Sequence, residues 1–446
     1  MLKLLLALPL LFLPNALHFS GAPLMAGLNL SNLMLLLVLV AIPVFSPAGA
    51  PRLAGFGRLG PALLWLALAY VVAFVIAVWR SSATLMEDLT ILKTALFYPM
   101  FYFLYRNCRA DLRQTRQLIV VTLVVAVVAG IEAVHEGLTT GMLSTYSEDN
   151  RASGPFGTNA LTANLAGYFY AGFLPLFIAG ALFLKGKPRL RMAAIIGAGI
   201  LGLAVLATFS RQAYAISLLC VLLLALRRNL AAALLIGLLM LAATTALPDS
   251  VTERVSETRQ VTQVGTTELD QSTASRFDIW TGALQMWTDH PEGVGLNRFK
   301  ANIGDYTSYS GFDAHNYFVL MLAEAGPLGL AALVFLLWRL WGMARTVQRE
   351  AAPGDSEQRA LGTGFSLMVI ALALGNSFGS FFLQGLAMGS VWAFVGLVER
   401  YGALKAHERA HPPVPAASTA VAPMPGRFPL VERARTATGM GNFGAR

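Results

Sequence analysis

Long apolar runs, separated by short polar connections, dominate the pattern along the chain. A helix needs about 20 residues to cross the hydrocarbon core of a bilayer. Runs close to that length occur at 2–19, 30–47, 60–79, 89–105, 117–136, 161–184, 192–209, 212–226, 230–247, 327–343, 359–376 and 379–398. Because such runs present no polar face to water, they predict membrane spans. The predicted fold class is therefore an all-α polytopic membrane protein with about 12 transmembrane helices.

Two connections are too long to be simple turns, namely 137–160 and 248–315. In the second, apolar residues at helical spacing predict an amphipathic helix over 275–291, ended by Pro291. Its expected apolar face consists of Phe277, Trp280, Ala283, Leu284 and Trp287. A short helix over 316–326 follows, and Gly326–Pro327 is expected to break or kink the chain before the next span.

These patterns divide the chain into four parts. Residues 1–247 carry spans one to nine, and 248–326 form a large, partly helical cap outside the membrane. Residues 327–400 carry spans ten to twelve. Residues 401–446, which include HPPVPAASTAVAPMPG, have the composition of a disordered tail.

Composition and charge agree with this division. Only 13% of residues are charged and 56% are apolar, whereas soluble domains carry about 25% charged residues. Lys and Arg gather on alternate connections: Arg52, Arg58, Arg106, Arg109, Arg113, Arg116, Lys185, Lys187, Arg189, Arg191, Arg227, Arg228, Arg345 and Arg349. The connections on the other side hold Arg80, Arg151 and Arg211. The positive-inside rule then predicts that both termini are cytoplasmic and that the cap lies on the outer side of the membrane. The net charge of +9 reflects this topology, and no nucleic-acid partner is predicted.

Several chemistries find no support in the sequence. The two cysteines, Cys108 in an inner loop and Cys220 in a span, suggest neither a disulfide nor a thiolate metal site. A Gly-rich phosphate loop and an Asp-x-Asp pair are both lacking, so no nucleotide, metal or other cofactor is predicted. Asp88, beside Glu87, is interpreted as a solvated loop acid.

His315 is the histidine best placed for chemistry, because it stands with Asp313 and Asn316 at the start of a hydrophobic helix. An imidazole with a pKa near ~6.5 suits proton abstraction. Alternatively, Asp313 caps the helix and His315 lies at the membrane interface; taken alone, the motif favours this capping role. Glu324 is interpreted as structural, contacting Tyr317 or the backbone to hold the short helix.

Two arginines are candidates for binding an anion. Arg211 lies at a polar point between two spans, on the side poor in arginine, and its planar guanidinium suits diphosphate oxygens. The alternative is that it reaches to the membrane interface. Arg276 begins the amphipathic helix, where a salt bridge to Asp278 or Glu268 is the alternative.

Four stretches, taken in order, resemble the O-antigen ligase/polymerase superfamily of bacterial envelope proteins. They are GPFGTNALTANLAGYF (154–169), FSRQAY (209–214), SRFDIWTGALQMWTDHPEGVGLNRF (275–299) and HNYFVLMLAEAGPLGL (315–330). The resemblance implies a GT-C-like, lipid-donor glycosyltransferase in the inner membrane, acting at the periplasmic face on an undecaprenyl-diphosphate-linked glycan without a metal. It implies that His315 is the catalytic base and that Arg211 and Arg276 bind the diphosphate. Arg298, Asp313 and Asn316 are candidate supporting residues.

Within the superfamily, the preferred function is that of an O-antigen ligase, which transfers the polysaccharide to a sugar of lipid A–core with inversion. The alternative is a polymerase of O-antigen or exopolysaccharide. The ligase is preferred because the outer chain is concentrated in one loop. A secondary transporter predicts paired charges within the spans, which the sequence does not show. A membrane scaffold leaves Arg211 and His315 unexplained.

Overall fold

The structure is a computed structural model that describes residues 2–14, 30–46, 49, 51–81, 83–142, 147, 150–157, 160–227, 229–243, 259–261, 267–269 and 271–411. The chain forms two units, Met1–Leu404 and Lys405–Arg446. All contacts below lie within the first unit.

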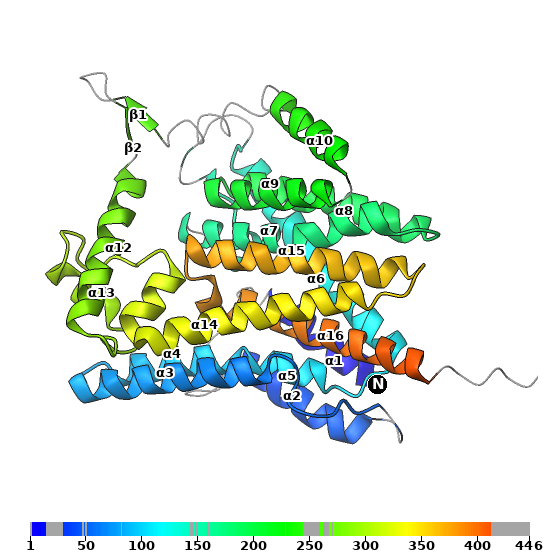
Figure 1. The fold of residues 1–446 in the computed structure, drawn as a ribbon, viewed down its shortest axis with the longest axis horizontal. Helices are drawn as coiled ribbons and strands as arrows, with labels where there is room; N and C mark the ends of the chain where they lie inside the picture. The colour runs from blue at the N-terminus through cyan, green and yellow to red at the C-terminus, as the bar shows by residue number, and fades with distance from the viewer. Residues whose placement is uncertain are drawn as a thin grey trace, which may run out of the picture. The chain divides into compact units, whose positions relative to one another are not determined.

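Helices account for nearly all of the described elements (Figure 1). They are α1 (Leu2–Phe12), α2 (Leu30–Phe45), α3 (Gly60–Arg80), α4 (Leu85–Phe97), α5 (Met100–Arg106), α6 (Leu112–Thr139), α7 (Ala160–Phe183), α8 (Pro188–Ala207), α9 (Arg211–Leu226), α10 (Leu230–Ala243), α12 (Gln271–Asp289), α13 (Phe299–Asn302), α14 (Tyr317–Arg349), α15 (Ser356–Ser377) and α16 (Gly385–Ala410). Single 3-10 turns occur at η3 (Gly154–Phe156), η5 (Ile303–Asp305) and η6 (Phe381–Leu383). An antiparallel hairpin pairs β1 (Arg259–Val261) with β2 (Thr267–Leu269); the sequence analysis did not predict it.

Each of the predicted apolar runs overlaps a helix, but not all of these helices are long enough to cross a membrane. Within the described residues, six helices are long and apolar enough: Gly60–Arg80, Leu112–Thr139, Thr162–Phe183, Pro188–Ala207, Tyr317–Arg349 and Ser356–Ser377. The run at 89–105 is divided between α4 and α5. The polytopic helical class is confirmed, while the count of twelve spans stays a prediction. At the C-terminal end, α16 extends through 401–410, past the expected boundary at 400, and 412–446 lies outside the described residues.

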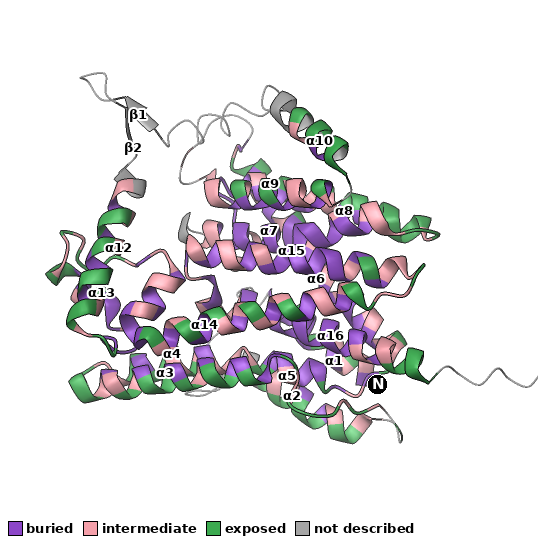
Figure 2. Cartoon of the chain, in the orientation of Figure 1, coloured by how far each residue is buried: buried purple, intermediate pink, exposed green. Residues whose placement is uncertain are grey.

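The exposed faces of the long helices are apolar. Figure 2 shows exposed positions recurring along α3 and α8, and the exposed apolar side chains include Leu64, Trp65 and Leu68 on α3, Val120, Val124 and Val128 on α6, and Ile195 and Ile196 on α8. A continuous apolar surface of this extent is unfavourable in water. These faces therefore belong in lipid.

Close helix packing fixes the inner helices. α14 packs against both α3 and α15, and α7 packs against α8, α9 and α15. A Cβ atom at Gly364 of α15 would lie 2.6 Å from Cα of Leu176 in α7. A Cβ atom at Gly362 would lie 2.6 Å from Cα of Gln348 in α14. Because no side chain fits at either glycine, the backbones approach closely, as small residues allow in membrane proteins.

The predicted break at Gly326–Pro327 is confirmed. Gly326 has φ 62° and ψ −162° inside α14, which divides the helix at a kink. A residue with a side chain is disfavoured there, and a Cβ atom would also lie 2.8 Å from the backbone oxygen of Glu292. The first part of α14, Tyr317–Ala325, therefore meets the rest of the helix at an angle set by this glycine.

A buried polar cluster holds α16 to the start of α3 and to α5. The Glu399 carboxylate accepts hydrogen bonds from Arg106 Nε at 2.9 Å, from the Tyr102 hydroxyl at 2.6 Å and from the backbone N–H of Arg58 at 2.9 Å. The fully buried Arg400 donates to backbone carbonyls around the α5–α6 connection. Two of the basic residues that were read as setting topology, Arg58 and Arg106, thus also hold the fold together at this end.

Candidate active site

His315 lies in a short segment that is fixed on both sides. Its backbone N–H donates to Asp313 Oδ1 at 3.0 Å, and the Trp280 indole of α12 donates to the carbonyl of Ala314 at 2.8 Å. Asn316 is the N-cap of α14, because its Oδ1 accepts the N–H groups of the second and third helical residues at 3.0 and 3.3 Å. The capping role that the sequence left to Asp313 therefore belongs to Asn316.

The backbone of His315 is strained. Its φ is +47°, in the left-handed region that residues other than glycine rarely adopt. Such conformations persist where neighbouring contacts impose them, and they concentrate at functional sites. Here the Asp313 carboxylate, the Trp280 indole and the Asn316 cap hold the backbone on both sides of His315.

The surroundings of His315 favour its neutral form. Burial first, and then the positive charge of Arg276, lower its pKa below the usual value. Asp313 acts in the opposite direction, and Lys300, which pairs with Asp313 at 3.4 Å, lowers the pKa further. A neutral imidazole can accept a proton.

Arg276 lies within electrostatic reach of both His315 and α7. It lies in α12, one helical turn before Trp280, and its charge acts on His315. The same charge, together with that of Arg151, acts on the hydroxyl of Tyr168 in α7. That hydroxyl donates to the carbonyl of Phe378 at 3.0 Å. The roles that the sequence analysis gave to Arg276 and His315 stay predictions.

Arg151 was missed as a site residue by the sequence analysis. Its side chain is buried; its Nε donates to the carbonyl of Thr208 at 3.1 Å and its Nη2 to Asn164 Oδ1 at 2.6 Å. The signal was its position three residues before the motif at 154–169, which contains Asn164. An arginine fixed in this way adds a buried positive charge that acts, like that of Arg276, on Tyr168.

Arg211 begins α9, directly after the turn to which Arg151 is bound. Ser210 caps the helix by accepting the N–H of Ala213, and Phe209 before it has φ +47°. A Cβ atom at Gly167 of α7 would lie 2.8 Å from Cβ of Ala213. The turn thus presses on the same stretch of α7 that carries Tyr168. The turn before Arg211 is thus joined to Arg151 and to the stretch of α7 that carries Tyr168.

Arg298 is occupied by a structural contact. Its guanidinium binds both carboxylate oxygens of Asp88, at 2.7 and 2.8 Å, and the carbonyl of Ser81 at 2.9 Å. Asp88 is fully buried, so its interpretation as a solvated loop acid was wrong. Hydrogen bonds and the charge of Arg298 lower the pKa of Asp88, against the opposing effect of burial. This pair joins α3 and α4 to the cap, so Arg298 supports the site from outside it.

Glu324 fixes the Gly-rich turn at 293–299 to the first part of α14. The sequence analysis predicted such a contact of Glu324 with the backbone. Its buried carboxylate accepts the N–H of Phe299 at 3.1 Å, and its carbonyl accepts the N–H of Gly295 at 3.0 Å. Gly293 has φ 96°, and a Cβ atom there would lie 2.4 Å from the carbonyl oxygen of Glu324. The turn can approach this closely only with glycine.

The predicted apolar face of the amphipathic helix was partly wrong. α12 exists, but its buried residues include Ile279, Ala283 and Met286, while Phe277 and Leu284 are exposed. The buried stripe lies at i, i+4 and i+7 and packs against α14 and η5. Two apolar stripes occur on one helix, and the sequence does not show which of them meets the protein.

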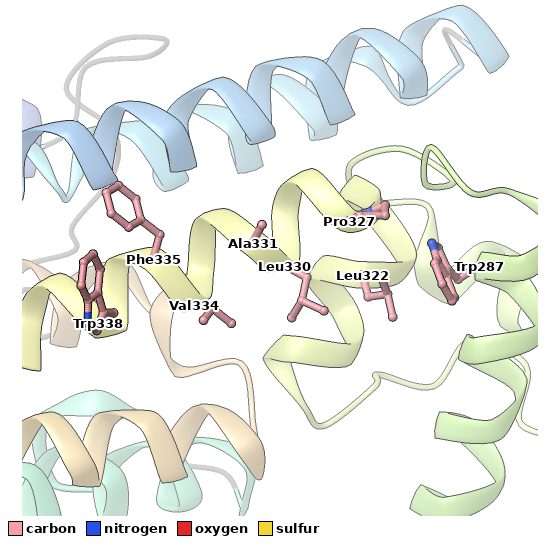
Figure 3. A pocket seen from close by; sticks show the side chains of 8 residues that line it. All are labelled: Trp287, Leu322, Pro327, Leu330, Ala331, Val334, Phe335 and Trp338. Atoms are coloured by element: carbon pink, nitrogen blue, oxygen red, sulfur yellow. The ribbon is translucent and has the colours of Figure 1, made fainter.

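An apolar groove, here called the α14 groove, runs along the kinked helix beside α12 (Figure 3). It has a volume of about 640 Å³. Trp287 of α12 and Leu322 and Pro327 of α14 lie at one end, and Phe335 and Trp338 at the other. The groove therefore begins at the cap and continues along the membrane-spanning part of α14.

Breaking the Arg298–Asp88 pair is expected to destabilise the protein. Asp88→Asn leaves a buried guanidinium without its counter-charge, which typically costs about 3–5 kcal/mol. Thermal unfolding of the purified chain in detergent measures the loss. The control is Glu292→Gln, which removes an exposed ion pair with Arg80 worth about 0–1 kcal/mol. Equal unfolding temperatures for the two variants would contradict the structural role of Arg298.

Comparison with known families supports the resemblance. Residues 196–334 match the model of the O-antigen ligase family. The match contains Arg211, Arg276 and His315, and it confirms the O-antigen ligase/polymerase superfamily over this segment. The family indicates a glycosyltransferase-like activity in O-antigen processing. A search of curated proteins gave no match.

Proposed function

We propose that this protein is an O-antigen ligase, which transfers a polysaccharide from undecaprenyl diphosphate to a sugar of lipid A–core. The observation that carries the proposal is the juxtaposition of His315 and Arg276. The backbone of His315 is held in a strained conformation, its lowered pKa favours the neutral imidazole, and the positive charge of Arg276 acts on it. Together they supply the two things that the reaction requires: a base for the acceptor, and a partner for the departing anion.

In the proposed reaction, the acceptor hydroxyl attacks the anomeric carbon of the donor sugar. His315 accepts the hydroxyl proton as the new glycosidic bond forms. The bond from the anomeric carbon to the diphosphate oxygen breaks, and the electron pair leaves with the lipid diphosphate. Arg211 and Arg276 stabilise the charge that develops on this group. Attack opposite the leaving group inverts the anomeric centre.

The α14 groove supports a lipid-linked donor. It is lined by apolar side chains and leads from the cap, near Trp287, along α14. A polyprenyl chain in this groove would stay in the bilayer while its diphosphate reaches the arginines. The proposal places the cap and His315 on the periplasmic side of the inner membrane, because the connections at the opposite helix ends carry most of the Lys and Arg.

A deletion strain tests the ligase against the polymerase. Loss of a ligase leaves bare lipid A–core on a lipopolysaccharide gel, with long glycan retained on undecaprenyl diphosphate. Loss of a polymerase leaves core capped by a single repeat unit. Complementation with the wild-type chain restores the ladder of long O-antigen chains in either case. The gel pattern of the deletion strain therefore distinguishes a ligase from a polymerase.

The pH dependence of transfer is expected to report the charges around His315. Lys300 lowers the pKa of His315 and Asp313 raises it. The base works when unprotonated, so activity falls as pH drops through this pKa. Lys300→Gln therefore shifts the acid limb of the pH–rate profile to higher pH, and Asp313→Asn shifts it to lower pH. Shifts in the same direction, or none, would contradict the assignment of His315 as the titrating base.

A further inference from the structure

A second groove opens between α6 and α8, near the helix ends opposite to His315. α7 forms its floor, and its volume is about 500 Å³, within the range of about 300–1,000 Å³ that is common for ligand sites. Small residues line it, among them Gly180 of α7 and Ala193 and Gly197 of α8. We call it the α6–α8 groove.

The length of the groove matches one leaflet of a bilayer. Its wall on α6 runs from Ile119 to Ile131, which corresponds to about 18 Å of helix. The hydrocarbon core is about 30 Å thick, so one leaflet accounts for about half of it. Val120, Val124 and Val128 in this wall are exposed. The groove therefore suits one acyl chain of a lipid in a single leaflet.

The mouth of the groove is positively charged. Arg116 Nε and Lys187 Nζ both bind the carboxylate of Glu357, which also lines the groove. Two cations facing one carboxylate leave one positive charge within this trio. The side chains of Arg116 and Lys187 are 44% and 41% exposed. Both can therefore reach a second anion without leaving Glu357.

We propose that the α6–α8 groove binds a phospholipid with an anionic headgroup. One acyl chain lies on α7 between α6 and α8, and the headgroup phosphate contacts Arg116 and Lys187. A helix from a partner or from a second copy fits less well, because the groove extends over one leaflet only and ends at cations. The bound lipid joins α6, α7, α8 and α15 at the end of the protein remote from the candidate active site.

Native mass spectrometry of the purified full chain tests the headgroup. The chain is titrated with dioleoyl phosphatidylglycerol and, separately, with dioleoyl phosphatidylcholine. One phosphatidylglycerol is expected to bind more tightly than phosphatidylcholine. Arg116→Gln and Lys187→Gln each weaken its binding about fivefold, from the contribution of one cation near a membrane surface. The control is Arg189→Gln, exposed at the start of α8, which leaves it unchanged.

Two further variants separate binding from folding. Glu357→Gln frees both cations and is expected to strengthen phosphatidylglycerol binding, which a misfolded protein could not do. Ala193→Phe fills the groove and abolishes tight binding, whereas Ile195→Phe, on the exposed face of the same helix and outside the groove, does not. Equal affinity for the two lipids, unchanged binding by Ala193→Phe, or a dimer that only Ala193→Phe dissociates would each overturn the proposal.

Discussion

His315→Ala is expected to abolish glycan transfer while the protein still inserts in the membrane at its normal level. Removing a positioned general base typically costs about 10²–10⁴-fold in rate. The imidazole caps no helix, because Asn316 performs that function, and the contact of its segment with Asp313 is made by the backbone. The alanine variant therefore keeps the backbone contacts that hold the segment.

Complementation of a deletion strain measures this effect, with the protein level in membranes determined by immunoblot. His290→Ala is the matched control, since His290 lies after α12 beside Arg80, at 3.4 Å, and has no role in the proposed reaction. His315→Gln is expected to be as inactive as the alanine variant, because an amide cannot serve as the base. Transfer at the wild-type rate by either His315 variant would remove His315 from the mechanism.

The positions of the helices followed from the sequence, because burial in lipid requires long apolar runs. The kink at Gly326 was equally accessible, since a glycine followed by proline cannot continue a regular helix. The lengths of the helices did not follow from the sequence. The run at 89–105 contains Pro99, and the chain divides there into α4 and α5. Hydrophobicity alone does not show whether such a run spans the membrane.

Contacts between distant residues were the hardest to foresee. Asp88 and Arg298 are separated by 210 positions, and neither local pattern marks the other as its partner. Asp88 was read as solvated because it stands beside Glu87 in a polar connection. The same limit explains Arg151: its partner Thr208 lies in another connection, 57 positions away.

Candidate residues that lie within one stretch of the chain were easier to select from the sequence. His315, Asp313 and Asn316 were selected together, and the structure gives each a separate function. Asn316 caps α14, Asp313 fixes the backbone of His315, and neither contact uses the imidazole. What the sequence could not provide was the strain at His315 or its pKa, because both arise from contacts with α12 and the cap.

Arg211→Lys and Arg276→Lys are expected to impair transfer severely, by about 10²–10³-fold, the usual cost of losing one group that stabilises developing charge. Lysine keeps the charge but loses the planar pair of donors that can hold two diphosphate oxygens at once. The control is Arg80→Lys, an exposed arginine paired with Glu292 at 2.5 Å, which is expected to transfer normally.

The kinetics of these variants distinguish stabilisation of the departing diphosphate from binding of the donor before the reaction. If the arginines stabilise the departing diphosphate, the lysine variants lose kcat more than they raise KM for the donor, because the interaction strengthens as charge develops. An arginine that only holds the donor would raise KM and leave kcat unchanged. Arg276→Lys keeps the positive charge beside His315, so the acid limb of its pH–rate profile is expected to stay near that of the wild type. A loss of rate without a shift in this limb therefore assigns Arg276 to the diphosphate and not to the base.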